Sequence, residues 1–260
     1  MHRNVLTISA LDPSGGTGIV ADLKTLMAWR MYGMAVTTAI IAQNTQGVDS
    51  VYPVPMEVIG TQLESIVSDI EIHAVKIGIM TAPKTMELVI ELLRAFNLSN
   101  LVVDPVLHSS TGFQYADEKM IAIYKEKMFP LAECVTPSIQ EASIFAGIPV
   151  GDVAQMKQAA EIIQKMGPRN VVITGGHLEG RAMDVLYDGS RHTVYDAPKA
   201  ATTHTRGLGD TFSAIIALHL AKKMKVSAAI DPAKKYIIRA MVHPFKIGNG
   251  NGPLNHNVAI

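Results

Sequence analysis

The sequence predicts an α/β fold built around a mainly parallel β-sheet, in one domain that covers residues 1–260. Short apolar and β-branched runs alternate along the chain with amphipathic stretches of ten residues or more, which is the pattern of successive β-α-β units. Apolar residues make up 48% of the chain, enough for a sizeable core. Because no repeat, low-complexity tract or linker interrupts this pattern, one domain is the simplest organisation.

Apolar runs that end at polar or glycine-rich turns predict the strands. Asp188-Gly189-Ser190 is a turn sequence between two such runs, so these two are expected to form a hairpin. The expected strands cover residues 5–10, 34–42, 74–80, 101–106, 131–136 and 170–174, and the hairpin covers 183–187 and 191–195.

Stretches with apolar residues at helical spacing predict the helices between these strands. Pro83 marks a first helical turn, Gly167-Pro168 is a stop signal, and Asp231-Pro232 is a start signal for the last helix. The expected helices cover residues 19–29, 55–69, 85–96, 117–127, 153–166, 211–224 and 226–242, and another begins near Glu141.

Composition excludes several classes of function. Lys and Arg number 23, as do Asp and Glu, so no basic surface for nucleic acid or membrane lipids is expected. No apolar run is long enough to cross a bilayer, and no secretory signal precedes the first strand. The single cysteine, Cys134, excludes an internal disulfide and is expected to be buried, which favours a cytoplasmic protein. His and Cys show no zinc-site spacing, and no G-x-S-x-G elbow occurs.

Residues 205–214 form the most informative stretch, a glycine turn that opens into an apolar helix. Gly207 and Gly209 allow the backbone N–H groups of this turn, including that of Leu208, to point into one concavity. The helix N-terminus adds partial positive charge there, which suits a phosphoryl group in transfer. Asp210 is placed to accept a proton from an attacking hydroxyl, although the same residues also suit an ordinary helix start with an aspartate cap.

Two further features support a ligand site at one edge of the sheet. Residues 12–18 form a turn-rich loop between a strand and a helix, but they match neither a Walker loop nor G-x-G-x-x-G. Asp104 follows an expected strand, and ligands gather at the carboxyl ends of strands in parallel sheets. The polar loop 109–112 could fold over a substrate.

The G-x-G-D turn and its small-residue helix resemble the signature of the ribokinase superfamily. Other stretches, in order along the whole chain, resemble hydroxymethylpyrimidine/phosphomethylpyrimidine kinases; they are residues 10–19, 21–25, 42–45, 103–106, 136–137, 175–177 and 250–256. The resemblance implies a ribokinase-like three-layer α/β/α sandwich with a mainly parallel central sheet. It also implies ATP and Mg²⁺ as cofactors, and a homodimer.

The activity implied by the resemblance is ATP-dependent phosphorylation of 4-amino-5-hydroxymethyl-2-methylpyrimidine and of its monophosphate, in thiamine diphosphate synthesis. Asp210 would activate the hydroxymethyl group, and the N–H groups of residues 207–210 would hold the transition-state charge. The implied substrate-binding residues are Asp22, Gln43, Met80 and Val106. The side-chain amide of Gln43 matches an aminopyrimidine, because it offers an acceptor beside a donor.

The chain departs from the family pattern around the nucleotide and the metal. Thr174 stands where family members commonly carry Lys before a Gly-Gly turn, so Thr174, Gly176 and Arg206 are the candidate nucleotide-binding residues, with Arg206 supplying the missing charge. Glu141 and Asp104 are the candidate metal-binding residues. Ser138 replaces the asparagine that usually accompanies this glutamate.

Asp210 is the sharpest departure, because many pyrimidine kinases of this family carry Cys there. A pyridoxal/pyridoxine kinase of the same superfamily is therefore the alternative, and a non-catalytic pyrimidine-binding sensor is a third reading. Asp22 and Glu141 also suit first-turn helix charges, and Gln43 suits an ordinary loop. His204 suits either a phosphate contact or a structural turn.

Overall fold

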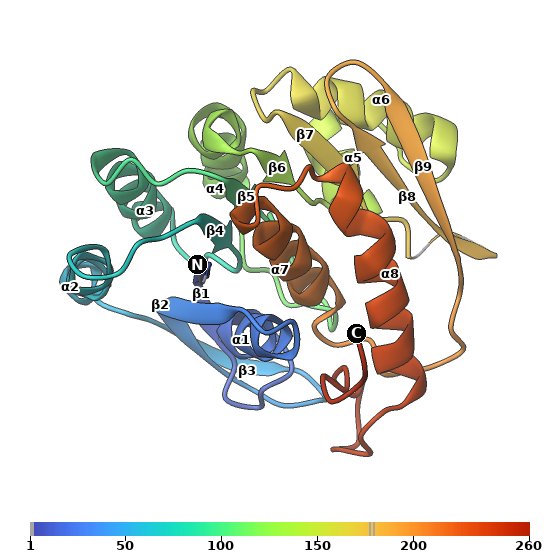
Figure 1. Cartoon of the computed structure of the whole chain (residues 1–260), viewed down its shortest axis with the longest axis horizontal. Helices are drawn as coiled ribbons and strands as arrows, with labels where there is room; N and C mark the ends of the chain where they lie inside the picture. The colour runs from blue at the N-terminus through green and yellow to red at the C-terminus, as the bar shows by residue number, and fades with distance from the viewer. Residues whose placement is uncertain (1–2, 177, 179) are drawn as a thin grey trace.

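A nine-stranded sheet runs through the part of the chain described by the computed structural model, which covers all residues except 1–2, 177 and 179 (Figure 1). The strand order is β3-β2-β1-β4-β5-β6-β7-β8-β9. The six strands from β2 to β7 in this order are parallel, and β3, β8 and β9 are antiparallel. The strands are β1 (Asn4–Leu11), β2 (Tyr32–Gln43), β3 (Val48–Pro53), β4 (Ala74–Ile77), β5 (Leu101–Val103), β6 (Cys134–Val135), β7 (Asn170–Ile173), β8 (Arg181–Tyr187) and β9 (His192–Pro198).

Helices cover both faces of the sheet and make three layers, which confirms the expected fold class. One face carries α1 (Gly18–Ala28), α7 (Leu208–Ala221) and α8 (Ser227–Val242). The other carries α2 (Met56–Val67), α3 (Pro83–Ala95), α4 (Glu118–Ile123), α5 (Ile139–Ala146) and α6 (Val153–Gln164), with short helical turns at Tyr124–Met128 and Phe129–Leu131. None of the described helices has the length and apolar character needed to cross a membrane.

Alternate strand residues divide between two hydrophobic cores. In β4, Val75 and Ile77 join the core beneath α2–α6, whereas Ala74 joins the core beneath α1, α7 and α8. This follows from the two-residue period of a strand, because both faces of the parallel sheet are covered. Cys134 is buried in the second core, as expected from its apolar neighbours.

The strand order reverses at β1, which lies between β2 and β4. The chain leaves β1 through α1 on one face and leaves β4 through α3 on the other, so a crevice is expected at the carboxyl ends of these two strands. The C-terminal tail returns to this edge, where Pro253 pairs with Arg206 and the Gly250 N–H donates to Thr45 Oγ1.

Some element boundaries differ from those expected. Strand β3 was not foreseen, because Val48–Pro53 is a partly exposed edge without an apolar run. Helix α7 begins at Leu208 rather than at residue 211, since Gly207 takes a left-handed conformation as its N-cap. The expected helix at 117–127 changes at Tyr124 into a wider turn. His177, the last residue of the expected Gly175-Gly176-His177 turn, lies outside the described residues.

Candidate active site

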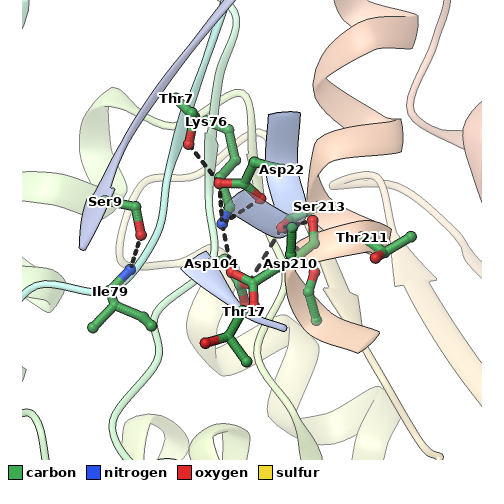
Figure 2. Close-up of polar contacts among 12 residues, drawn as sticks. Thr7, Ser9, Thr17, Asp22, Lys76, Ile79, Asp104, Asp210, Thr211 and Ser213 are labelled. Carbon is green, nitrogen blue, oxygen red and sulfur yellow. Dashed lines mark hydrogen bonds and ion pairs between the residues drawn. The ribbon is translucent and has the colours of Figure 1, made fainter. Parts of the chain in front are cut away.

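A buried ion cluster lies at the carboxyl edge of the sheet, centred on Lys76 of β4 (Figure 2). Its Nζ lies 3.0 Å from each carboxylate oxygen of Asp22 in α1 and 3.0 Å from Oδ1 of Asp210 in α7. The Thr7 hydroxyl of β1 also donates to Asp22. One ammonium thus joins three elements that are distant in the sequence.

Asp104, directly after β5, adds a third buried carboxylate to this region. Thr136 Oγ1 and Ser213 Oγ donate to its two oxygens at 3.3 and 3.2 Å. Burial raises the pKa of Asp104 to about 8, and the nearby Asp210 carboxylate adds to the rise while Lys76 opposes it.

The pKa values of Asp22 and Lys76 are also shifted by burial and by the neighbouring charges. Burial raises the pKa of Asp22 to about 7, with Lys76 opposing and Asp210 contributing. Burial works against the charged form of Lys76, but Asp22 and Asp210 outweigh it and hold the pKa of Lys76 above its usual value. Three carboxylates therefore share one ammonium, an arrangement that suits a bound cation or an extra proton.

The expected anion hole lies beside this cluster. Gly207 has φ 82°, and a Cβ there would lie 2.3 Å from the Gly16 carbonyl oxygen, so no side chain fits. Helix α7 follows at once, and the first N–H groups of a helix have no partner within it. Asp210 lies in this first turn and is 7% exposed. An anion bound there would meet both the turn and the positive end of α7.

The loop after β1 is organised around the buried carboxylate of Asp12. Burial by itself raises the pKa of Asp12, but hydrogen bonds from Ser14 and Thr17 together with the Arg206 charge hold it below its usual value. Arg206 Nη2 lies 3.3 Å from Asp12 Oδ2, and its side chain is almost fully buried. Arg206 is thus held at the Asp12 loop. The loop groups that donate to Asp12 are Ser14 N and Oγ, Gly16 N, and Thr17 N and Oγ1.

The expected substrate-binding residues lie in different settings. Gln43 ends β2 and its Nε2 donates to Thr17 Oγ1 at 2.9 Å, which ties it to the Asp12 loop. Val106 is half-buried and packs on a small apolar cluster that includes Ile79. Met80 is fully enclosed in the larger core. The structure therefore brings Gln43 and Asp22 to the edge of the sheet, but Asp22 is as fully enclosed there as Met80 is in the core.

Glu141 serves as a helix cap in this structure. Its Oε2 accepts from Ser138 N and Oγ at 2.8 and 2.9 Å, and its Oε1 accepts from Leu107 N at 3.1 Å. Burial raises the pKa of Glu141, and these hydrogen bonds oppose the rise. Among the residues with described positions, no group of three or more His, Cys, Asp or Glu side chains is arranged to hold a metal ion.

Another buried ion pair fixes the Thr174–Gly176 turn after β7. Gly175 N donates to Asp184 Oδ1 at 2.9 Å, and Lys234 Nζ of α8 lies 2.6 Å from Asp184 Oδ2. A Cβ at Gly175 would lie 2.0 Å from the Met183 carbonyl oxygen. The turn is thus held by β8 and α8 together.

Lys76 was missed at the level of the sequence, although it carried a signal. It is the only charged residue in the run 74–80, and a charge in the middle of a buried strand requires a partner. The sequence could have indicated a buried ion pair here, but not that its partners are Asp22 and Asp210.

Comparison with known proteins decides the family. The family model described as phosphomethylpyrimidine kinase matches residues 12–255. This chain belongs to the phosphomethylpyrimidine kinase family. A hydroxymethylpyrimidine/phosphomethylpyrimidine kinase of Haemophilus influenzae is 38% identical over 259 residues, which cover 98% of this chain and 96% of that protein.

Solved structures from two branches are similar to this phosphomethylpyrimidine kinase family member. The structure of a phosphomethylpyrimidine kinase from Clostridium difficile is 38% identical, with a TM-score of 0.80 over 90% of this chain and 97% of that one. An ADP complex of Bacillus subtilis pyridoxal kinase is 35% identical, with a TM-score of 0.91 over 98% of each chain. The fold is therefore common to both branches.

Proposed function

We propose that this chain transfers a phosphoryl group from ATP to the hydroxymethyl group of 4-amino-5-hydroxymethyl-2-methylpyrimidine, and then to the resulting monophosphate. The observation that carries the proposal is Asp210 in the first turn of α7, beside the Gly207 turn and the buried Asp22–Lys76 pair. The family match and the name of the Haemophilus influenzae relative support the substrate.

Asp210 acts as the general base in this proposal. Its Oδ1 is engaged by Lys76, and Oδ2 is available to accept the proton of the substrate hydroxyl. The N–H groups of residues 207–210 then face the oxygens of the phosphoryl group, where negative charge builds in the transition state, and the Leu208 N–H gives up its 3.4 Å hydrogen bond to the Thr205 carbonyl oxygen to do so. The positive end of α7 stabilises the same charge.

The pyrimidine is bound from the opposite side by Gln43 and Asp22. The Gln43 amide pairs with the ring nitrogen and the exocyclic amine, while Asp22 contributes the negative charge next to that amine. Val106 and Met80 supply the apolar part of the pocket, and Met80 does so only if the core around it opens, because it is fully enclosed here. Arg206 lies at the Asp12 loop, on the side of the anion hole.

ATP is placed between the Thr174–Gly176 turn and the α7 N-terminus. An open surface depression of about 660 Å³ is lined by Thr202, His204, Met241 and neighbours, directly before the glycine turn, and suits the adenosine part. ADP in the Bacillus subtilis pyridoxal kinase complex supports a nucleotide site on this fold. Asp104 and Glu141 would hold Mg²⁺, because their buried carboxylates lie close enough to raise the pKa of Asp104. Mg²⁺ supplies charge neutralisation of the phosphates.

The test is ADP release with Mg-ATP and either the hydroxymethylpyrimidine or its monophosphate, for the wild type and for Asp210→Asn. We expect turnover of both pyrimidines and a fall of about 10²–10⁴-fold in the variant, because an amide cannot accept the proton. Turnover that is unchanged in Asp210→Asn would contradict the role of this carboxylate.

A pyridoxal kinase is the second candidate, favoured by the Bacillus subtilis pyridoxal kinase structure, which covers the whole described fold. Pyridoxal also carries a hydroxymethyl group on an aromatic ring, so the same base would serve. Turnover of pyridoxal alone in the assay above would assign the chain to this activity. Binding of pyrimidine without any turnover would instead support the sensor reading.

Three expectations remain predictions under this proposal. A single kinase domain over residues 1–260, a cytoplasmic location and a homodimer follow from the sequence and the resemblance. Sedimentation equilibrium of the purified chain tests the dimer, and limited proteolysis that yields no stable fragment would support the single domain.

A further inference from the structure

Lys76 contacts the proposed base but has been given no role of its own so far, although its position is closely constrained. It is fully buried in the middle of β4, and both of its carboxylate partners come from other elements. A Cβ at Gly78 would lie 2.6 Å from Lys76 Nζ and 2.5 Å from Ser9 Oγ. The ammonium thus occupies space that any side chain at residue 78 would require, so Gly78 leaves room for it.

The contacts of Asp210 give this ammonium a specific role. Among the described residues, Lys76 is the one side chain that donates a hydrogen bond to the Asp210 carboxylate, and it reaches Oδ1 alone. When one oxygen of a carboxylate is fixed in this way, the group can no longer rotate freely, and its other oxygen keeps one direction. Helix α7 fixes the backbone position of Asp210, and Lys76 fixes the orientation of its carboxylate.

The same ammonium also links the two sides of the proposed site. Both oxygens of Asp22 lie 3.0 Å from Lys76 Nζ, and Thr7 holds Asp22 from the sheet. Any shift of Asp22 on substrate binding is therefore transmitted to Asp210 through a single buried group. The other charged group that faces Lys76 is Asp104, which is paired with Thr136 and Ser213 instead.

We propose that Lys76 is a positioning residue for phosphoryl transfer: it fixes Oδ1 of Asp210 so that Oδ2 meets the substrate hydroxyl, and it couples this carboxylate to Asp22. The inference rests on the proposed function, because it takes Asp210 as the base. A purely structural ion pair would affect turnover whether or not Asp210 is present. A positioning role for Lys76 affects turnover only when Asp210 is present.

The test is a double-mutant cycle in an Asp22→Asn background. Lys76→Met in this background removes one positive and one negative charge together, so the cluster keeps its wild-type net charge and the variant is expected to fold. Each variant is checked by circular dichroism and thermal unfolding. Turnover with Mg-ATP and the hydroxymethylpyrimidine is then compared with and without Asp210→Asn.

When Asp210 is present, Lys76→Met is expected to lower kcat about 10²-fold, the loss that follows from a displacement of about 1 Å of a catalytic group. When residue 210 is asparagine, the same substitution is expected to change kcat by less than about threefold, because the two residues act as a unit.

Two further variants serve as controls for the loss of the Lys76 charge and for the loss of an unrelated ion pair. Lys76→Gln retains a donor without the charge and is expected to recover part of kcat. Lys127→Met breaks an exposed Lys–Glu pair of 2.9 Å and is expected to leave kcat unchanged. Equal losses from Lys76→Met in both backgrounds would overturn the inference alone. A wild type without turnover, or one insensitive to Asp210→Asn, would contradict the proposed function and the inference with it.

Discussion

The ion pair between Asp184 and Lys234 offers a direct test of how the Thr174–Gly176 turn is held, where we propose that ATP binds. Both side chains are only 8% exposed, and Lys234 Nζ lies 2.6 Å from the carboxylate. The other carboxylate oxygen accepts the N–H of Gly175 at 2.9 Å. Lys234→Met should fill similar space but leave a buried carboxylate without its cation.

The expected cost is about 3–5 kcal/mol in the free energy of unfolding, which is typical when one partner of a buried pair is removed. That is a large share of the about 5–15 kcal/mol that stabilises a domain. The titration of Asp184 determines how the loss of stability in Lys234→Met depends on pH. Burial raises its pKa and Lys234 opposes the rise, so the pKa of Asp184 rises further in the variant. The folded variant then binds a proton more tightly than the unfolded chain. Its loss of unfolding free energy relative to the wild type should therefore be larger at pH 8 than at pH 5.

Urea unfolding at both pH values measures the deficit, and the KM for ATP reports on the turn. We expect KM to rise because the Gly175 N–H loses its fixed acceptor. The double variant Lys234→Met/Asp184→Asn should recover much of the stability, and Lys127→Met serves as the exposed control. A loss below about 1 kcal/mol in Lys234→Met, equal at the two pH values, would refute the reasoning.

Three other predictions follow from single positions. Gly207→Ala should destabilise the fold by about 1–3 kcal/mol and reduce kcat, because φ at residue 207 is 82° and the Gly16 carbonyl blocks a Cβ there. Urea unfolding and initial rates measure both effects. Gly60→Ala is the matched control, because a Cβ at residue 60 would have no atom within 4 Å. The KM for the pyrimidine should fall as pH rises through about 7, where Asp22 ionises, and Asp22→Asn should abolish this step in the pH profile. Cys134 should react with a thiol reagent only on unfolding, because burial raises its pKa; rapid labelling of the native protein would contradict this.

Much of the architecture was predictable, because it depends on local pattern. The alternation of apolar runs and amphipathic stretches places the parallel strands and all the longer helices, and the turn 188–190 places the hairpin. Strand β3 escaped because an exposed edge needs no apolar run. The start of α7 was placed three residues late, since only the backbone conformation of Gly207 reveals where that helix begins.

The candidate site was predictable in part. The glycine turn identified Asp210, and the strand end identified Asp104, since both signals are local. That Arg206 lies near the nucleotide phosphates stays a prediction, and the structure pairs its guanidinium with Asp12, almost two hundred residues earlier. A long-range partner of this kind leaves no pattern in a single sequence.

The sequence by itself determined the fold class, the edge of the sheet where we propose that ligands bind, and the family resemblance, because hydrophobic period, turn chemistry and motif order are properties of short segments. The tertiary structure alone decided which charges meet. Lys76 lies 54 residues from Asp22 and 134 from Asp210 in the chain, and only the packing of α1 against α7 on the same face of the sheet as the Lys76 side chain brings the three within hydrogen-bond distance. Burial then makes the pairing necessary, since an isolated charge cannot stay ionised in an apolar interior.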